Sequence, residues 1–139
     1  MPSTTAASHF LWKPEYSVGV EFVDTQHKKL IGIINQLSDA MAAGRGREVL
    51  GPILDELVLY TKRHFADEEK FLANFRYSDL AAHTAVHRSM TNQVIALRAK
   101  FNTGPIGNTV EVFNFLKAWL RDHILQRDMA YSREYLQRK

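Results

Sequence analysis

Apolar residues recur every three or four positions along four stretches of the chain, the spacing that gathers them on one face of an α-helix. The first stretch covers about residues 21–41 and precedes Gly44-Arg45-Gly46, a segment that would end a helix. The second reaches about Leu72 and has Pro52 near its start. Proline is tolerated in the first turn of a helix but kinks a longer one, and the pattern leaves both outcomes open.

Two connections separate the remaining stretches. Residues 74–79 form a short link to a third helix, which is expected to run to about Phe101. Residues 102–107 then contain two glycines and a proline, a composition typical of a loop. Asn108, with Glu111 three positions later, has the spacing of a capping box, so a fourth helix should begin there.

Short connections between amphipathic helices predict an all-α fold, namely an up-down-up-down four-helix bundle. The bundle should span residues 21–127 of a single domain that covers residues 1–139, because a chain of 139 residues is the size of one compact domain. Residues 1–18 would form an N-terminal arm, in which Phe10, Leu11 and Trp12 are expected to dock on the bundle. Residues 128–139 would form a C-terminal tail with a short helix.

Charge and composition narrow the classes of function. The chain has 18 Lys and Arg against 15 Asp and Glu, and the basic residues are spread along the helices apart from a short basic end at residues 133–139. Nucleic-acid binding is therefore not expected. No apolar run reaches membrane-spanning length and the N-terminus lacks the features of a secretory signal, so we expect a cytoplasmic protein without membrane insertion. We also expect a monomer.

Five of the six histidines and two carboxylates form a pattern that is distributed over the four predicted helices. The groups are His27, His64-x3-Glu68, His83-x3-His87 and His123-x4-Asp128. Residues four apart lie on the same face of a helix, so the second and third groups can each direct two donor atoms at one point. A five-residue step turns Asp128 away from His123, unless the turn widens into a π-bulge or the helix ends and the chain bends inward.

Imidazole nitrogens combined with carboxylate oxygens suit Fe, Zn, Mn or Ni. The chain has no cysteine, which excludes iron–sulfur clusters and thiolate zinc sites. A carboxylate has two oxygens and can bridge two metals, so Glu68 and Asp128 are the natural bridges in a site with two ions. The five histidines would then divide as three and two, which leaves one metal short of a ligand.

Each part of this pattern also has a purely structural explanation. A lone histidine on an apolar helix face is more often a hydrogen-bonded core residue than a ligand, and a single His-x3-Glu or His-x3-His pair can lie exposed on a helix surface. The coincidence favours metal binding, because five histidines occupy positions that their own helices turn inward and only His9 lies outside the pattern.

From Trp12 to Tyr131 the chain resembles the hemerythrins, specifically their single-domain bacterial branch, and all seven ligand positions of that family are filled. The shared motifs are Trp12-x5-Val18-Gly19-Val20, Asp24-x-Gln26-His27-Lys28-x-Leu30, Tyr60-Thr61-x2-His64-Phe65-x2-Glu68-Glu69, His83-x3-His87 and Trp119-Leu120-x2-His123-Ile124-x3-Asp128.

The resemblance implies a non-haem di-iron centre (Fe2+/Fe3+) with an oxo or hydroxo bridge, which binds O2 reversibly for storage, transport or delivery. Glu69 is not a ligand under this assignment. The implied ligands are His83, His87 and His123 for one iron, His27 and His64 for the other, and Glu68 and Asp128 as bridges between them. The positions that match the wall of the family's O2 pocket are Leu30, Phe65, Trp119, Leu120, Ile124 and Tyr131.

The resemblance implies a carrier and not an enzyme, with O2 as its ligand and an oxygen-consuming enzyme as a partner for delivery. Two other classes of protein remain open. A di-iron oxidase, peroxidase or nitric-oxide-handling enzyme would typically have paired Glu-x-x-His motifs, which are absent at these positions. An oxygen or iron sensor would need an output domain, which we do not expect in this chain.

Overall fold

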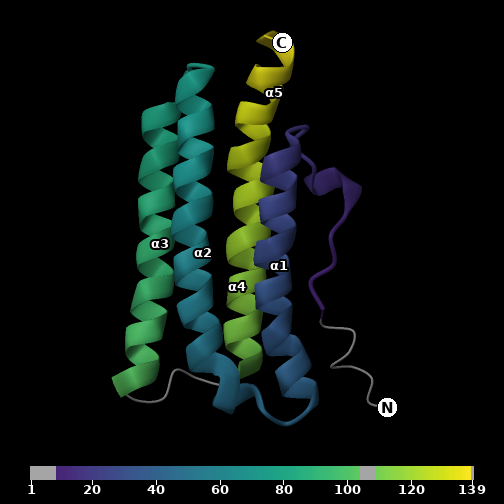
Figure 1. Ribbon diagram of the computed structural model, residues 1–139, viewed down its shortest axis with the longest axis vertical. Coiled ribbons are helices and arrows are strands. Elements are labelled where there is room, and N and C mark those ends of the chain that lie inside the picture. Colours follow the sequence, from purple (N-terminus) through teal and green to yellow (C-terminus); the bar gives the residue numbers. More distant parts are fainter. Residues whose placement is uncertain (1–8, 104–108, 139) are drawn as a thin grey trace.

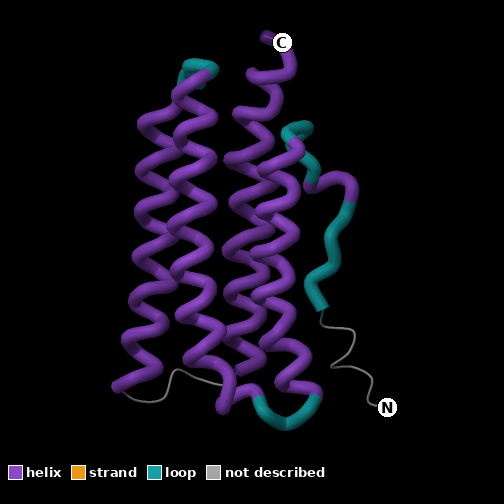
Figure 2. The backbone as a smooth tube through the Cα atoms, viewed as in Figure 1, coloured by secondary structure: helices purple, strands orange, loops and turns teal. Residues whose placement is uncertain are grey.

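The computed structural model describes residues 9–103 and 109–138, and its main body is a bundle of four antiparallel helices (Figure 1). The helices are α1 (Glu21–Ala42), α2 (Gly46–Asn74), α3 (Leu80–Thr103) and α4 (Thr109–His123). Throughout the described part of the chain, the elements are helices joined by short connections (Figure 2). The predicted all-α, up-down-up-down architecture is confirmed.

The chain continues in helical form beyond α4. A π-helical turn at Ile124–Asp128 leads into α5 (Met129–Arg138), which extends along the line of α4 in Figure 1. The short C-terminal helix predicted from the sequence is therefore present. This helix continues directly from α4, because the backbone stays helical from α4 through the wider turn into α5.

The connections between helices largely follow the predicted breaks. Gly44 adopts a φ of 73°, the left-handed conformation that glycine accepts without strain, and so lets the chain leave α1. The amide of Arg45 then donates to the carbonyl of Ala40 at 2.7 Å. Helix α3 continues to Thr103, so the first two residues of the loop predicted at 102–107 are helical. Residues 104–107 and Asn108, the predicted capping residue, lie outside the described residues.

Pro52 lies inside α2 and not in its first turn, which answers the question that the sequence left open. The helix begins at Gly46 and continues past the proline to Asn74. Proline has no amide hydrogen, so the carbonyl four residues earlier lacks its usual helical partner at this point.

Residues 9–18 of the N-terminal arm pack beside α1 (Figure 1) and include a short 3-10 turn at Pro14–Tyr16. Phe10 is buried, and its backbone makes two hydrogen bonds with the side-chain amide of Asn35, at 2.8 and 2.9 Å. Trp12 packs against the core. Leu11 is 67% exposed, so the expectation that it docks on the bundle was wrong.

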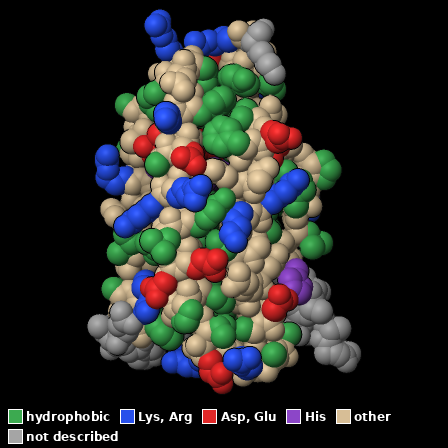
Figure 3. All heavy atoms as spheres, viewed as in Figure 1, with side chains coloured by type: hydrophobic (Ala, Val, Ile, Leu, Met, Phe, Trp, Pro, Cys, Tyr) green, Lys and Arg blue, Asp and Glu red, His purple; other side chains and the backbone are tan. Residues whose placement is uncertain are grey.

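Leucines and isoleucines from the inner faces of the helices fill the core together with Phe113 and Val112. Helix α1 packs against α2 and α4, and α2 packs against α3. Acidic and basic side chains are interspersed over the face shown in Figure 3. Within residues 9–103 and 109–138, none of the helices has the length and apolarity needed to cross a bilayer.

Two leucines on α2 allow a direct test of this core. Leu57 is fully buried, whereas Leu59 is 71% exposed. We expect Leu57→Ala to lower the free energy of unfolding by about 2–5 kcal/mol, because it leaves a cavity in the core. Leu59→Ala should change it by no more than about 0.5 kcal/mol. Urea denaturation of both variants in the same metal state measures the difference, and similar losses would contradict this helix orientation.

Candidate metal centre

All seven side chains of the predicted ligand set lie together inside the bundle, and none is more than 5% exposed. They come from four helical segments: His27 from α1, His64 and Glu68 from α2, His83 and His87 from α3, and His123 and Asp128 from the α4 end and its π-helical turn. The sixth histidine, His9, lies at the surface of the bundle beside Asp39.

The donor atoms form two adjacent groups that share Glu68. One group consists of Glu68, His83, His87, His123 and Asp128, and the other of His27, His64 and Glu68. Within each group the potential ligand atoms all lie within 4.8 Å of one another. The arrangement therefore offers two neighbouring positions for cations, one beside three histidines and one beside two.

Asp128 faces both groups. Its Oδ2 atom lies 3.1 Å from His27 Nε2, while its Oδ1 atom lies 3.1 Å from His123 Nε2 and 3.2 Å from His83 Nε2. The π-helical turn allows this position, because its extra residue per turn brings Asp128 back to the face of His123. Of the two alternatives considered from the sequence, the widened turn is the one observed.

Glu68 divides its oxygens in the same way. Its Oε1 atom lies 2.9 Å from His87 Nε2 and 3.2 Å from His83 Nε2, and its Oε2 atom lies 3.7 Å from His64 Nε2 and 4.0 Å from His27 Nε2. Each carboxylate thus presents one oxygen to each group of histidines, which is the arrangement required of a ligand that bridges two ions.

Tyr131 fixes the orientation of Glu68. Its hydroxyl donates to Glu68 Oε2 at 2.7 Å, and its ring lies 5.5 Å from that of His83. Burial and the neighbouring carboxylates raise the pKa of Tyr131 well above its usual value, so the hydroxyl keeps the proton that it donates. The sequence indicated Tyr131 only as a wall residue, and this contact with a carboxylate adds to that expectation.

Two histidines are oriented by acceptors outside the cluster. His87 Nδ1 donates to Glu69 Oε2 at 2.7 Å, and His64 Nδ1 donates to Gln26 Oε1 at 2.7 Å. With the proton on Nδ1, the Nε2 atom of each ring carries a free lone pair directed into the cluster. His87 Nε2 and Glu68 Oε1 then lie only 2.9 Å apart, a contact that needs either a second proton on the ring or a metal cation between the two atoms.

Buried polar atoms without hydrogen-bond partners also indicate that the cluster binds cations. The Nε2 atoms of His27, His64, His87 and His123 and both carboxylate oxygens of Asp128 are buried without a hydrogen-bond partner among the described residues. Several lie close to one another by distance, but their angles do not suit hydrogen bonds. Buried polar atoms are normally paired, so a group converging on one region fits the binding of metal cations.

The electrostatics of the cluster depend on the two buried carboxylates. Burial disfavours the charged form of His83, but its close contacts with the Asp128 and Glu68 carboxylates outweigh this effect and raise its pKa to about 9. Burial lowers the pKa of His64 to about 4, because its carboxylate contacts are longer. Both carboxylates have pKa values below the usual range, since their histidine contacts outweigh burial. A buried pair of negative charges therefore attracts cations, whether protons or metal ions.

The six predicted wall residues are all buried. Phe65 stacks on the ring of His87 at 3.7 Å, nearly parallel to it, and also borders His64 and His123. Trp119 donates its ring N–H to the carbonyl of Met90 at 3.3 Å, which satisfies its one polar group. The other wall residues are Leu30, Leu120 and Ile124, which belong to the core, and Tyr131.

Comparison with known proteins agrees with this geometry. A family model described as the hemerythrin HHE cation binding domain matches residues 18–134. The chain belongs to the hemerythrin family. The match includes all seven clustered residues and therefore joins the buried donor set to a family named for cation binding.

Several hemerythrin relatives cover most of the chain. Bacteriohemerythrin of Pseudomonas aeruginosa is 32% identical over 125 residues, which are 89% of this chain and 80% of that protein. Bacteriohemerythrin of Methylococcus capsulatus is 34% identical over 118 residues, 85% of this chain and 89% of that protein. A crystal structure of wild-type hemerythrin, 33% identical, superposes with a TM-score of 0.79 over 88% of this chain and 94% of its own.

The hydrogen bonds that orient His64 and His87 from outside this hemerythrin centre were not predicted from the sequence. Gln26 reaches His64 from another helix, and its amide nitrogen donates to Asp67 at 2.9 Å. Glu69 reaches His87 across the α2–α3 interface. Gln26 and Glu69 do belong to the motifs that carry the resemblance, but nothing in their spacing shows which histidine each one contacts.

Removing metal from this hemerythrin should destabilise the whole bundle, because donors from four helical segments converge on the cluster. A metal at a hundredfold excess over its Kd would add about 2.7 kcal/mol to the free energy of unfolding. Thermal unfolding followed by circular dichroism should therefore give a lower Tm for chelator-treated protein than for the same sample after metal is restored. Coincident curves would show that metal does not bind within the core.

Proposed function

We propose that this hemerythrin binds O2 reversibly at a non-haem di-iron centre and serves in the storage, transport or delivery of oxygen. The observation that carries the proposal is that Glu68 and Asp128 each direct one oxygen to the three-histidine group and one to the two-histidine group. The names of the bacteriohemerythrin relatives support it.

The residues divide naturally between two irons. We assign one iron to the three-histidine group and the other to the two-histidine group, with the carboxylates as bridges. The ligands are His83, His87 and His123 for the first iron, His27 and His64 for the second, and Glu68 and Asp128 for both. Two ferrous ions held there would supply the electrons for reversible O2 binding, and the two-histidine group would provide its ion with fewer protein ligands than the three-histidine group.

The protein's own contribution is to hold these ligands and to exclude water. Tyr131 and the helix positions keep Glu68 in place, and the outer hydrogen bonds to His64 and His87 fix their protons on Nδ1. The apolar wall around the centre includes Phe65 and Trp119, whose polar N–H is already bonded. A dry wall admits O2 but limits the water and protons that would leave the iron oxidised.

A carrier is distinguished from a di-iron oxidase, peroxidase or nitric-oxide-handling enzyme by turnover. We expect the iron-loaded protein to take up O2, to release it when oxygen is removed, and to regain the same visible absorption over repeated cycles. Absorption spectra recorded beside an oxygen electrode measure both quantities. Continuous O2 consumption in the presence of a reductant, without recovery of the deoxygenated spectrum, would support the enzyme alternative instead.

Opening the wall at Leu120 should shorten the lifetime of the oxygenated protein. Leu120 is 1% exposed, so Leu120→Ala removes buried apolar volume without adding a polar group. We expect faster decay of the oxygenated to the oxidised protein at unchanged iron content, with a stability loss of about 2–5 kcal/mol. Time-resolved absorption measures the decay, and Leu59→Ala serves as the control at an exposed leucine. Equal decay rates in two folded, iron-loaded variants would contradict a protective role for Leu120.

A further inference from the structure

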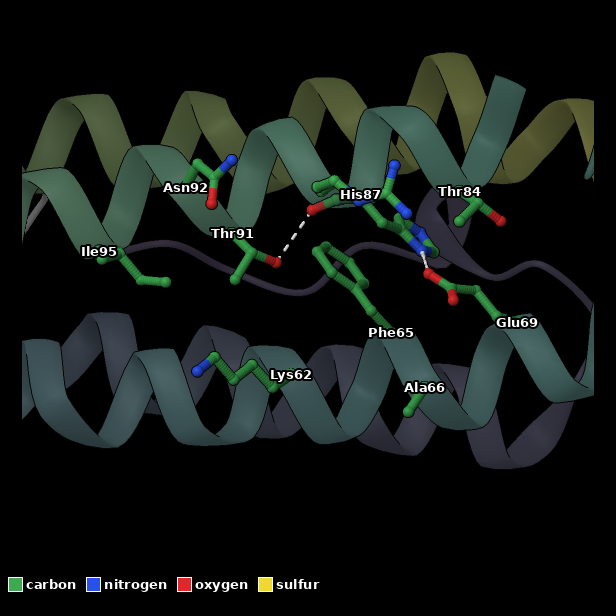
Figure 4. A pocket seen from close by; sticks show the side chains of 10 residues that line it. Lys62, Phe65, Ala66, Glu69, Thr84, His87, Thr91, Asn92 and Ile95 are labelled. Atoms are coloured by element: carbon green, nitrogen blue, oxygen red, sulfur yellow. Dashed lines mark hydrogen bonds and ion pairs between the residues drawn. The ribbon is translucent and has the colours of Figure 1, made fainter. Parts of the chain in front are cut away.

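One histidine in each group donates to an acceptor outside the cluster, and these two acceptors differ in charge. On the three-histidine side, His87 Nδ1 donates to Glu69 Oε2, a carboxylate oxygen, at 2.7 Å (Figure 4). On the two-histidine side, His64 Nδ1 donates to Gln26 Oε1, a neutral amide oxygen, at the same distance. The hydrogen bonds are equally short, so the acceptors differ chiefly in charge.

Glu69 is held in a defined position beside His87. It lines a pocket of about 330 Å³ between α2 and α3 and retains 32% side-chain exposure, whereas His87 is 2% exposed. In Figure 4 the carboxylate points from α2 toward the His87 ring, whose face is covered by Phe65. The stacked ring on one side and the short hydrogen bond on the other leave His87 little freedom to turn.

Gln26 is also fixed, and its neighbour determines which amide atom faces the histidine. Its Nε2 atom donates to Asp67 Oδ2 at 2.9 Å, so its Oε1 atom must be the acceptor for His64. A negative charge is therefore present on this side too, but it is separated from the imidazole by the length of an amide group. His64 receives a weaker electrostatic effect than His87 does.

A carboxylate that accepts a hydrogen bond from a ligating imidazole raises the basicity of the nitrogen bound to metal. Hydrogen bonds to an ionised acceptor are also about twice as strong as those between neutral groups. Higher basicity and an added negative charge both favour a metal cation at that position, and they favour the higher charge of Fe3+ over Fe2+. A neutral amide acceptor produces less of either effect.

We propose that Glu69 strengthens metal binding at the His83, His87 and His123 position and makes the centre easier to oxidise, while Gln26 leaves the His27 and His64 position the weaker of the two. Glu69 acts through His87 as a positioning and charge-tuning residue and does not itself bind metal. The inference rests on the proposed two-metal centre. It adds that the two positions differ in metal affinity, and that residues outside the ligand set cause the difference.

Cobalt(II) titration of the metal-free protein tests the inference without iron or O2. Glu69→Gln keeps an oxygen that can accept from His87 Nδ1 and removes only the charge. We expect the tighter of two Co2+ binding constants to fall about tenfold or more. Glu56→Gln removes the same charge from a partly exposed site on α2, where Glu56 is paired with Lys29, and should leave both constants unchanged.

A reciprocal variant moves charge toward the other histidine. Gln26→Glu combined with Asp67→Asn puts the carboxylate next to His64 and keeps the net charge of the chain. Asp67→Asn is included because a carboxylate at position 26 would otherwise face another one. We expect the weaker Co2+ binding constant to rise. If the two Co2+ binding steps overlap, competition with a chelator still gives the product of the two binding constants. This product should fall for Glu69→Gln and rise for the double variant.

The midpoint potential of the iron-loaded protein provides a readout that a purely structural role would not move. Glu69→Gln should raise it, because the lost negative charge had favoured Fe3+, and Glu56→Gln should not. The inference would be overturned if Glu69→Gln bound two Co2+ ions with unchanged binding constants and the iron-loaded variant had an unchanged midpoint potential. The proposed two-metal centre would then remain intact. Failure of the unmutated protein to bind two Co2+ ions would overturn the proposed centre and this inference together.

Discussion

Two carboxylates buried without solvent contact among five imidazoles impose the constraint on which the rest of this structure depends. Burying an unpaired charge is costly, and an apolar core would not tolerate Glu68 and Asp128 without cations beside them. Each helix of the bundle therefore has to present its histidines at the same level. The register of the four helices is set by this requirement as well as by apolar packing, since the cluster draws on all of them.

The same constraint accounts for the C-terminal part of the chain. The π-helical turn that brings Asp128 inward also sets the direction in which α5 leaves it. Helix α5 then contacts two other parts of the chain: Tyr131 donates to Glu68 on α2, and Ser132 donates to the carbonyl of Val18 in the N-terminal arm at 2.6 Å. Arg138 donates to the backbone carbonyl of Phe75 in the α2–α3 connection. A local departure from α-helical geometry at one ligand thus positions an entire helix.

The sequence predicted the features that depend on local periodicity. Helical spacing placed the four helices and set His64 with Glu68, and His83 with His87, on shared faces. It left open how Asp128 reaches the cluster and whether Pro52 starts or interrupts α2, because both depend on how the backbone adapts to its surroundings. Leu11 was expected to dock but lies exposed. The contact of Gln26 with His64 joins residues 38 positions apart on different helices, and no local pattern encodes such a pair.

Metal analysis of the unmutated protein, purified from iron-replete cells, is the most direct test of the central claim. Two irons per chain are expected, because the two groups of donors share two carboxylates and each group offers one position for a cation. A variant that loses the shared Glu68, Glu68→Ala, should lose iron from both positions, whereas Glu69→Ala should retain more. One tightly bound metal per chain, or stoichiometric zinc, would contradict the account.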